Sequence, residues 1–330
     1  MLRKKHDGFT VLEGLLILLV FIVIVGVGIY VWHRQSASIA GQNIIKSSNV
    51  WTFGGQALVG DNYAADPDVV KLDNGQYRMY YGQSPEKPGA GHSHPILSAI
   101  STDGKTFKPE AGVRLASGAF PDVIHLSNGS WRMYYQGSNG IDSASSSDGL
   151  NWTQDPGIRV STTNPDNLSL YQVGAPTIMQ QKDGTFVMVY SGYINKRYNS
   201  KVPNKDTHLF LWATSKDGLK FSVKGIAIES RNSTYQGWLD GPEWADWNGT
   251  WRLFYWGYAG IYFDTFNGSS FSSGQLVYEG QNASSESMAQ FQPHPPGDPT
   301  LMQIGNTWYL YYDMTLNNGN DLIYYATQKT

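Results

Sequence analysis

One short pattern occurs five times in this 330-residue chain, and it limits the fold more than any other feature. Each copy has an apolar run containing a proline, then an Asn-Gly, Asp-Gly or Gly-Asn pair, then an aromatic-rich run. Successive prolines of the pattern are 54, 55, 66 and 57 residues apart, at Pro67, Pro121, Pro176, Pro242 and Pro299. Spacing of this length is typical of propeller blades and other repeat arrays.

Each copy predicts a β-hairpin, because an Asn-Gly or Asp-Gly pair favours the left-handed backbone of a tight turn. Aromatic and branched residues then suit the pleated strand that follows the turn. In four copies a second turn comes later, at Asp103-Gly104, Asp148-Gly149, Asp217-Gly218 and Asn267-Gly268. Two hairpins give four strands, which is the anatomy of one blade. The sequence therefore predicts an all-β fold, a five-bladed β-propeller.

The fifth copy ends before a second turn, so its blade lacks one strand. Residues 51–59 (WTFGGQALV) resemble residues 152–160, the closing strand of the second copy. Pairing this segment near Trp51 with the last blade would close the ring and remove two exposed sheet edges. We therefore expect residues 50–330 to form one propeller whose fifth blade is completed by residues 51–59.

The first 49 residues are of a different kind. A basic head is followed by an uninterrupted apolar run of 18 residues from Leu15 to Trp32. A helix over residues 9–35 would be long enough to span a bilayer, at about 1.5 Å per residue. Basic flanks stay in the cytoplasm, so we expect a membrane-anchored protein with its propeller outside the cytoplasm, at the cell surface or on a filament. Residues 36–49 are polar and predict a spacer.

An acidic residue, Glu13, lies just inside the predicted helix of residues 9–35, where such a residue usually has a partner. The segment Gly8-Phe9-Thr10-Val11-Leu12-Glu13 resembles the leader of type IV prepilins and pseudopilins. The resemblance implies a leader peptide of residues 1–8 and cleavage after Gly8 by a prepilin peptidase. It also implies methylation of the new Phe9 amine and pairing of Glu13 with a neighbouring pilin-like subunit. A plain membrane anchor is the alternative.

Composition narrows the range of functions. The chain has no cysteine, so disulfides, thiolate metal sites and cysteine nucleophiles are excluded. Its net charge is −3, and no basic cluster follows the leader, which argues against nucleic acid as a partner. No cofactor or metal site is predicted, apart from a structural cation that could lie near the propeller axis.

Carboxylates gather where the repeat prolines would meet the axis. The residues after the prolines are Asp68, Asp122, Thr177, Glu243 and Thr300. Those before the prolines are Asp66, Phe120, Ala175, Gly241 and Asp298, with Asp240 one position earlier. Glycosidic bond cleavage needs such a set, one carboxylic acid and one carboxylate, and crowding raises the pKa of the acid. A single Asp-Pro could equally well just begin a strand.

Residues 50–330 resemble the five-bladed propeller glycosidases: arabinanases, β-xylosidases, invertases and levansucrases. The resemblance implies that Asp66 is the base or nucleophile, that Asp240 or Glu243 is the acid, and that Asp122 contacts substrate. Asp68, which follows Pro67, is a further candidate for substrate binding. Ala175 departs from the family, since it stands where an Asp of blade three is expected.

Other candidates for substrate binding lie in blades four and five. Trp238, Trp244 and Trp247 flank the blade-four carboxylates, where an aromatic ring could stack on a sugar or pack between blades. His294 and Asp298 precede and begin the first strand of blade five, close to the expected axis.

Two functions remain open from the sequence. The first is a surface-anchored, glycoside-hydrolase-like domain that acts on polysaccharide or oligosaccharide, with an inverting acid and base roughly 6.5–9.5 Å apart. The second is a non-catalytic glycan-binding adhesin or minor pilin-like subunit. Ala175 and the Asp240-Gly241-Pro242 sequence favour the second, and the number of axial carboxylates favours the first.

Overall fold

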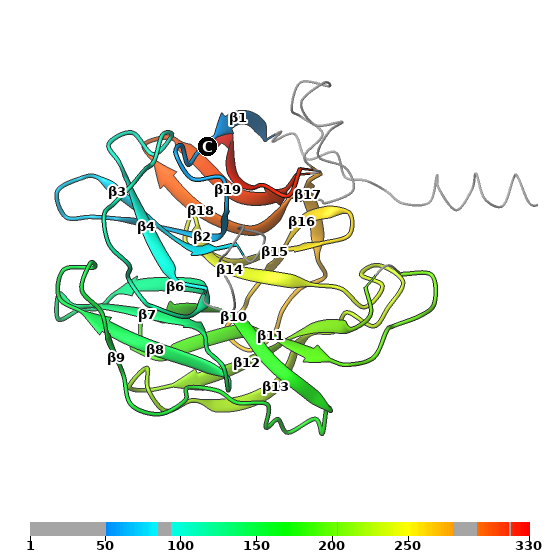
Figure 1. Cartoon of the computed structure of the whole chain (residues 1–330). Coiled ribbons are helices and arrows are strands. Elements are labelled where there is room, and N and C mark those ends of the chain that lie inside the picture. The colour runs from blue at the N-terminus through cyan, green and yellow to red at the C-terminus, as the bar shows by residue number, and fades with distance from the viewer. Residues whose placement is uncertain (1–50, 85–93, 203, 280–295, 317) are drawn as a thin grey trace, which may run out of the picture. The chain divides into compact units, whose positions relative to one another are not determined.

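The computed structural model describes residues 51–84, 94–202, 204–279, 296–316 and 318–330. The predicted leader, apolar helix and spacer, with Gly8, Phe9 and Glu13, lie outside these ranges, as does His294. Within them, no helix is long and apolar enough to cross a bilayer. The described part consists of strands joined by turns and loops (Figure 1).

The described strands form five four-stranded antiparallel sheets, as the repeat predicts. Blade one comprises β2 (Ala64–Lys71), β3 (Tyr77–Gln83), β4 (Ile96–Ser101) and β5 (Lys108–Pro109). Blade two comprises β6 (Ala119–His125), β7 (Trp131–Gln136), β8 (Ile141–Ser146) and β9 (Thr153–Gln154). Blade three comprises β10 (Leu170–Gln180), β11 (Phe186–Ile194), β12 (Thr207–Ser215) and β13 (Ser222–Ile228). Blade four comprises β14 (Asp240–Trp247), β15 (Thr250–Gly257), β16 (Gly260–Thr265) and β17 (Gln275–Tyr278).

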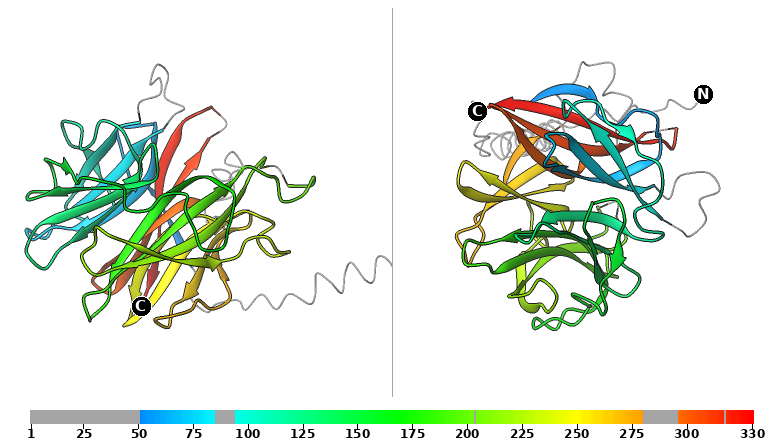
Figure 2. Two further views of the ribbon diagram at one scale, coloured as in Figure 1. Left: turned by 90° about the horizontal axis from the view of Figure 1, so that it is seen from below. Right: turned by 90° about the vertical axis from the view of Figure 1, so that its left-hand side faces the viewer.

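Blade five joins the two ends of the propeller. It comprises β18 (Gly297–Ile304), β19 (Thr307–Thr315), β20 (Asp321–Lys329) and β1 (Thr52–Gln56). β1 runs antiparallel to β20, with Thr52 opposite Thr327 and Gln56 opposite Tyr324. Figure 1 and the right-hand view of Figure 2 show the blue β1 beside the red end of the chain. β1 therefore supplies the fourth strand of blade five.

The first strands of the blades form the inner ring. β2, β6, β10, β14 and β18 each contact the next, and β18 returns to β2. Because each repeat proline lies on one of these strands, the five prolines and their neighbours surround one axis.

Aromatic side chains hold adjacent blades together. In three blades the first tyrosine of a Tyr-Tyr pair donates its hydroxyl hydrogen to a carbonyl in the second turn of a neighbouring blade. Tyr80 reaches Gly149 O at 2.8 Å, Tyr134 reaches Gly218 O at 2.8 Å, and Tyr311 reaches Gly104 O at 2.7 Å. The Asp-Gly turns of the sequence therefore serve as acceptors between blades as well as hairpin ends.

Candidate functional site

The residue before each repeat proline has an unusual backbone. All five have a positive φ: 53° at Asp66, 50° at Phe120, 42° at Ala175, 54° at Gly241 and 45° at Asp298. Each lies in a β-bulge where the inner strand shifts register against the second strand. A left-handed conformation costs a non-glycine residue about 1–2 kcal/mol, and a bulge redirects its side chain. Because Phe120 and Ala175 share it, the conformation belongs to the ring rather than to acidic residues.

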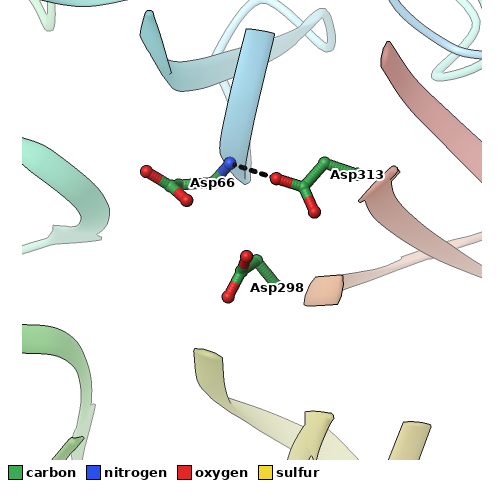
Figure 3. Close-up of side chains that lie close together, drawn as sticks. All are labelled: Asp66, Asp298 and Asp313. Atoms are coloured by element: carbon green, nitrogen blue, oxygen red, sulfur yellow. Dashed lines mark hydrogen bonds between the residues drawn. The ribbon is translucent and has the colours of Figure 1, made fainter. Parts of the chain in front are cut away.

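Three of these redirected residues, Asp66, Phe120 and Asp298, line a cavity of about 460 Å³. Asp313 of β19, Asp321 of β20 and Trp256 of β15 line it as well. One carboxylate oxygen each from Asp66, Asp298 and Asp313 lies within 4.8 Å of the other two. Figure 3 shows these three side chains together, with the backbone N–H of Asp66 donating to Asp313 Oδ2 at 3.0 Å.

Burial and mutual repulsion raise the pKa values of this group. For Asp66 and Asp298, burial has the largest effect and the neighbouring Asp313 adds to it, so both pKa values lie well above the usual range. Burial, with help from Asp321, raises the pKa of Asp313 to about 7. Burial and crowding therefore favour the protonated form of these three carboxyl groups.

Small residues on the surrounding strands leave room for these carboxylates. A Cβ at Gly82 would lie 2.9 Å from Asp66 Oδ2, and a Cβ at Gly297 would lie 2.9 Å from Asp313 Oδ1. A Cβ at Gly241 would collide with Asp298. The three glycines therefore fix how closely the acidic side chains can gather.

The residues after the prolines form a second level, deeper along the axis. Four of the five accept a backbone N–H from the inner strand of a neighbouring blade: Asp68 from Val123 at 2.8 Å, Asp122 from Ile178 at 3.3 Å, Thr177 from Trp244 at 3.1 Å and Thr300 from Val69 at 3.4 Å. The fifth, Glu243, accepts the hydroxyls of Thr177 at 3.3 Å and Thr300 at 3.2 Å. These side chains connect the blades around the ring.

Burial also raises the pKa values at this level. The pKa of Asp122 rises to about 7, chiefly through burial, against opposing hydrogen bonds from Thr177 and Ile178. Burial and then Asp122 raise the pKa values of Asp68 and Glu243 well above their usual ranges. A narrow space of about 30 Å³, lined by Asp122 and Glu243 as well as Asp66 and Asp298, connects the two levels.

Asp240 is enclosed by hydrogen-bond donors. Ser191 Oγ lies 2.5 Å and Tyr193 OH 3.4 Å from its Oδ1, and His208 Nδ1 lies 2.7 Å from its Oδ2. The other ring nitrogen of His208 is 2.9 Å from Asp206. Burial opposes a charge on His208, yet Asp240 and Asp206 raise its net pKa above the usual value. Asp240 is only 5% exposed and lines neither cavity described above.

The three tryptophans proposed from the sequence occupy different surroundings. Trp244 stacks on Phe271 at 5.9 Å, and Trp247 stacks on Trp308 at 4.4 Å, both within hydrophobic clusters between blades. Trp238 stacks on His208 at 3.9 Å. None of the three lines the two cavities, whereas Trp256, which sequence analysis did not select, lines the larger one.

Sequence analysis also did not select Asp313 and Asp321, because they lie on strands without a repeat proline. A signal for Asp313 does exist in the repeat. The residue after the Tyr-Tyr pair is Gly82 in blade one, Gln136 in blade two and Asp313 in blade five. Of these three equivalent residues only Asp313 is acidic. This difference between the copies is the signal that would have identified Asp313. For Asp321 we find no equivalent signal.

Comparison with known proteins places this geometry in context. No family model and no curated protein matches the sequence. Solved structures do match, among them a thermostable family-43 glycoside hydrolase with a TM-score of 0.61, 15% identity, and coverage of 83% of this chain and 91% of that one. The propeller therefore has the same fold as this glycoside hydrolase.

Two further structures agree with this assignment. RS223 β-xylosidase matches with a TM-score of 0.58, 14% identity, and coverage of 83% of this chain and 94% of that one. A family-43 β-xylosidase/α-arabinofuranosidase from a compost microbial metagenome, in complex with xylotriose, matches with a TM-score of 0.58 and 16% identity. The match covers 85% of this chain and 96% of that one. At such identities the likeness shows the glycoside-hydrolase-like fold and leaves the activity to be argued from the site.

Proposed function

We propose that this chain is a surface-anchored, carbohydrate-active propeller with glycoside-hydrolase chemistry. The observation that carries the proposal is the carboxylate group of the large cavity, where Asp66 lies beside Asp298 and Asp313. Because their pKa values are raised, a proton-bearing acid and an ionised carboxylate can coexist there near neutral pH. Hydrolysis of a glycosidic bond needs that combination.

Asp66 is assigned the role of base or nucleophile. Its side chain lines both the large cavity and the narrow axial space, and its Oδ2 accepts the backbone N–H of Phe120 at 3.2 Å. That hydrogen bond, together with the left-handed backbone, fixes the carboxylate in the cavity.

The proton donor is assigned to Asp298 on the basis of access. Asp298 lines the large cavity, where a sugar has room, and burial together with Asp313 raises its pKa, which favours its acid form. Glu243 also has a raised pKa, but the space of about 30 Å³ that it lines has room for a water and is too small for a sugar ring. Asp240 is surrounded by hydrogen-bond donors and lines neither cavity. Glu243 and Asp240 therefore stand as alternative acids.

The spacing of the carboxylates bears on the stereochemistry of hydrolysis. The nearest oxygens of Asp66 and Asp298 are within 4.8 Å, closer than the roughly 6.5–9.5 Å expected for inversion. A pair so close favours retention, with Asp66 as the nucleophile. Proton NMR of the first product anomer distinguishes Asp298 from the alternative acids, since inversion would require a more distant partner.

The test of hydrolysis uses the full chain in detergent with a panel of polysaccharides and oligosaccharides. We expect release of reducing ends by the wild type and its loss in Asp66→Asn. Asp73→Asn changes an exposed aspartate of blade one and is the matched control. Release that persists in Asp66→Asn would remove Asp66 from the mechanism, and no release from any glycan would reject the hydrolase.

Glycan binding without turnover is the second candidate, in an adhesin or a minor pilin-like subunit. Two observations favour it: Ala175 occupies the blade-three position, and Asp240 is sequestered by Ser191, Tyr193 and His208. Retention of the chain on a glycan array, with no reducing ends released from the same glycans, would establish this function instead.

Anchoring is proposed from the sequence of residues 1–35, through a helix processed as in prepilins. Mass spectrometry of the mature N-terminus tests this directly. We expect a chain that begins at methylated Phe9. An intact Met1 would indicate a plain anchor, and Glu13→Ala is expected to disturb only filament association.

A further inference from the structure

His208 lies between two carboxylates at the beginning of β12. Its Nδ1 is 2.7 Å from Asp240 Oδ2, and its Nε2 is 2.9 Å from Asp206 Oδ2. The residue is only 7% exposed. A neutral imidazole has one N–H donor and one acceptor, whereas an imidazolium has two donors. Because a carboxylate accepts hydrogen bonds, this geometry fits an imidazolium that donates one N–H to each acid.

The other groups around this pair of acids carry no positive charge. Tyr193 of β11 packs against the His208 ring with centroids 4.3 Å apart, and its hydroxyl lies 3.4 Å from Asp240 Oδ1. Tyr171 of β10 donates its hydroxyl hydrogen to Asp206 Oδ2 at 2.8 Å. Among the described residues, neither acid forms an ion pair with a lysine or arginine. The ring of His208 therefore carries the charge that balances the two acids.

The two acids differ in their access to water. The side chain of Asp206 is 24% exposed, and that of Asp240 is 7% exposed. If His208 loses its second proton, one of the two carboxylates loses its donor, which is costly for a buried group. Water can replace the donor at Asp206 more readily than at Asp240, so the contact with Asp206 is the one that breaks.

His208 also supports one wall of the large cavity through two tryptophans. Its ring stacks on Trp238 with centroids 3.9 Å apart and planes at 28°, so the imidazolium gains a cation–π attraction. Trp238 in turn meets Trp256 edge-on at 5.7 Å. Trp256 lines the cavity and donates its indole N–H to Asp298 Oδ1 at 2.9 Å. The two tryptophans connect the ring of His208 to the assigned proton donor.

We propose that His208 is a positioning residue of the candidate site, an imidazolium that fixes the wall formed by Trp238 and Trp256. This inference rests on the proposed function, because the wall borders the cavity where the glycan is expected to bind. Loss of the ring proton removes the hydrogen bond to Asp206 and the attraction to Trp238, so the wall loosens.

The loosening is expected as the pH rises. Burial opposes the charge, yet Asp240 and Asp206 raise the pKa of His208 above its usual value of about 6.5. The imidazolium is therefore complete below that pH and is lost as the pH passes the raised pKa.

The first measurement is nitrogen NMR of the full chain in detergent, labelled with nitrogen-15 in histidine and tryptophan. His208→Gln identifies the His208 signals by their absence. At about pH 7, above the usual pKa of histidine, we expect both ring nitrogens of His208 to carry a proton. Asp206→Asn should lower the pH at which His208 titrates by about one unit or more. A single protonated nitrogen at about pH 7 would overturn the inference.

His125 is the matched control for this measurement. It is exposed and stacks on Trp131 with centroids 4.3 Å apart, and it forms no ion pair within the described part of the chain. Its signals should not respond to Asp206→Asn. A shift of equal size at His125 would mean that the substitution acts on the whole fold, and would overturn the assignment to the Asp206 contact.

The second measurement follows the cavity wall without any substrate. Trp256→Phe identifies the indole N–H signal of Trp256. Part of its pH-dependent shift should follow the titration of His208, move to lower pH in Asp206→Asn and vanish in His208→Gln, while the part caused by Asp298 stays. If His208→Gln fails to fold, judged by thermal melting, Asp206→Asn gives the same test. A Trp256 signal that ignores the substitution in a folded variant would overturn the positioning role.

Kinetics separate this inference from the proposed function. On a glycan that the chain hydrolyses, KM should rise several-fold as the pH passes the titration of His208, with a smaller change in kcat. Asp206→Asn should move this rise to lower pH, and His125→Asn should leave it in place. A rise in KM that ignores Asp206→Asn would overturn the inference and leave the hydrolase standing. Absence of turnover on every glycan would reject the hydrolase, and the Trp256 signal would still decide the role of His208.

Discussion

The two levels of carboxylates along the propeller axis share one repeat but differ in their surroundings. We call them the cavity level, which is Asp66 and Asp298 with Asp313 and Asp321, and the linking level, which is Asp68, Asp122 and Glu243. At the linking level each carboxylate accepts a hydrogen bond from a backbone N–H or a hydroxyl of an adjacent blade. At the cavity level one oxygen of Asp321 has no hydrogen-bond partner among the described residues, and the side chains line an open space.

The difference follows from the position of each residue relative to the proline. A residue after the proline rejoins the strand ladder, where its side chain meets an N–H of the next inner strand. A residue before the proline lies in the bulge with a left-handed backbone, and its side chain is turned out of that ladder. One repeat thus supplies carboxylates for linking the blades and others for contact with a ligand.

The largest expected effect is a loss of activity when a carboxylate of the cavity level is replaced. Asp66→Asn should lower kcat/KM by about 10²–10⁴-fold, the usual contribution of a general base. Its melting temperature should be unchanged or slightly raised, because the substitution removes a carboxyl crowded by Asp313. Initial-rate kinetics and calorimetry on the same preparation measure both. A large loss of stability would instead assign Asp66 to the linking role.

The second prediction concerns stability at the linking level. Asp68→Ala removes the acceptor of the Val123 N–H and should lower the free energy of unfolding by about 1–3 kcal/mol. Asp68→Asn keeps a carbonyl acceptor and resembles the protonated acid, so it should cost less than Asp68→Ala. Denaturant unfolding followed by tryptophan fluorescence compares them. If the two variants are equally stable, the hydrogen bond between the blades has no energetic role.

The sequence predicts the linking of blades better than it predicts the cavity. Hairpin turns and the proline spacing are local signals repeated five times, so blade number, strand order and ring closure follow from them. Asp66 and Asp298 were found because they belong to the repeat. Asp313 reaches Asp66 only through closure of the ring, across 247 residues of sequence, and lies on a strand that carries no proline.

The tryptophans show the limit of sequence proximity. Trp244 follows Glu243 directly on a strand, so its side chain points to the opposite face, into the core between blades. Trp247 is four residues from Glu243, roughly 13 Å along the strand at about 3.3 Å per residue. Nearness to a carboxylate in sequence therefore did not place either ring in the cavity, and Trp256 on the next strand lines it instead.

The smallest expected effect is a pH dependence of stability that arises from Asp122 at the linking level. Its pKa is raised from 3.8 to about 7 by burial, so between these values the folded chain binds more protons than the unfolded chain. Its contribution to stability is therefore complete below about pH 4 and is lost as pH rises toward 7. The groups that face it are the Thr177 hydroxyl, the Ile178 N–H, and the carboxyls of Asp68 and Glu243.

Denaturant unfolding at several pH values from 4 to 8 tests this prediction on wild type, Asp122→Asn and the exposed control Asp73→Asn. The difference in unfolding free energy, wild type minus Asp122→Asn, should decrease as pH rises, while the control tracks the wild type. A flat or rising difference would contradict the raised pKa. The pKa of Asp313 at the cavity level is also raised to about 7, so the difference between wild type and Asp313→Asn should decrease with pH in the same way.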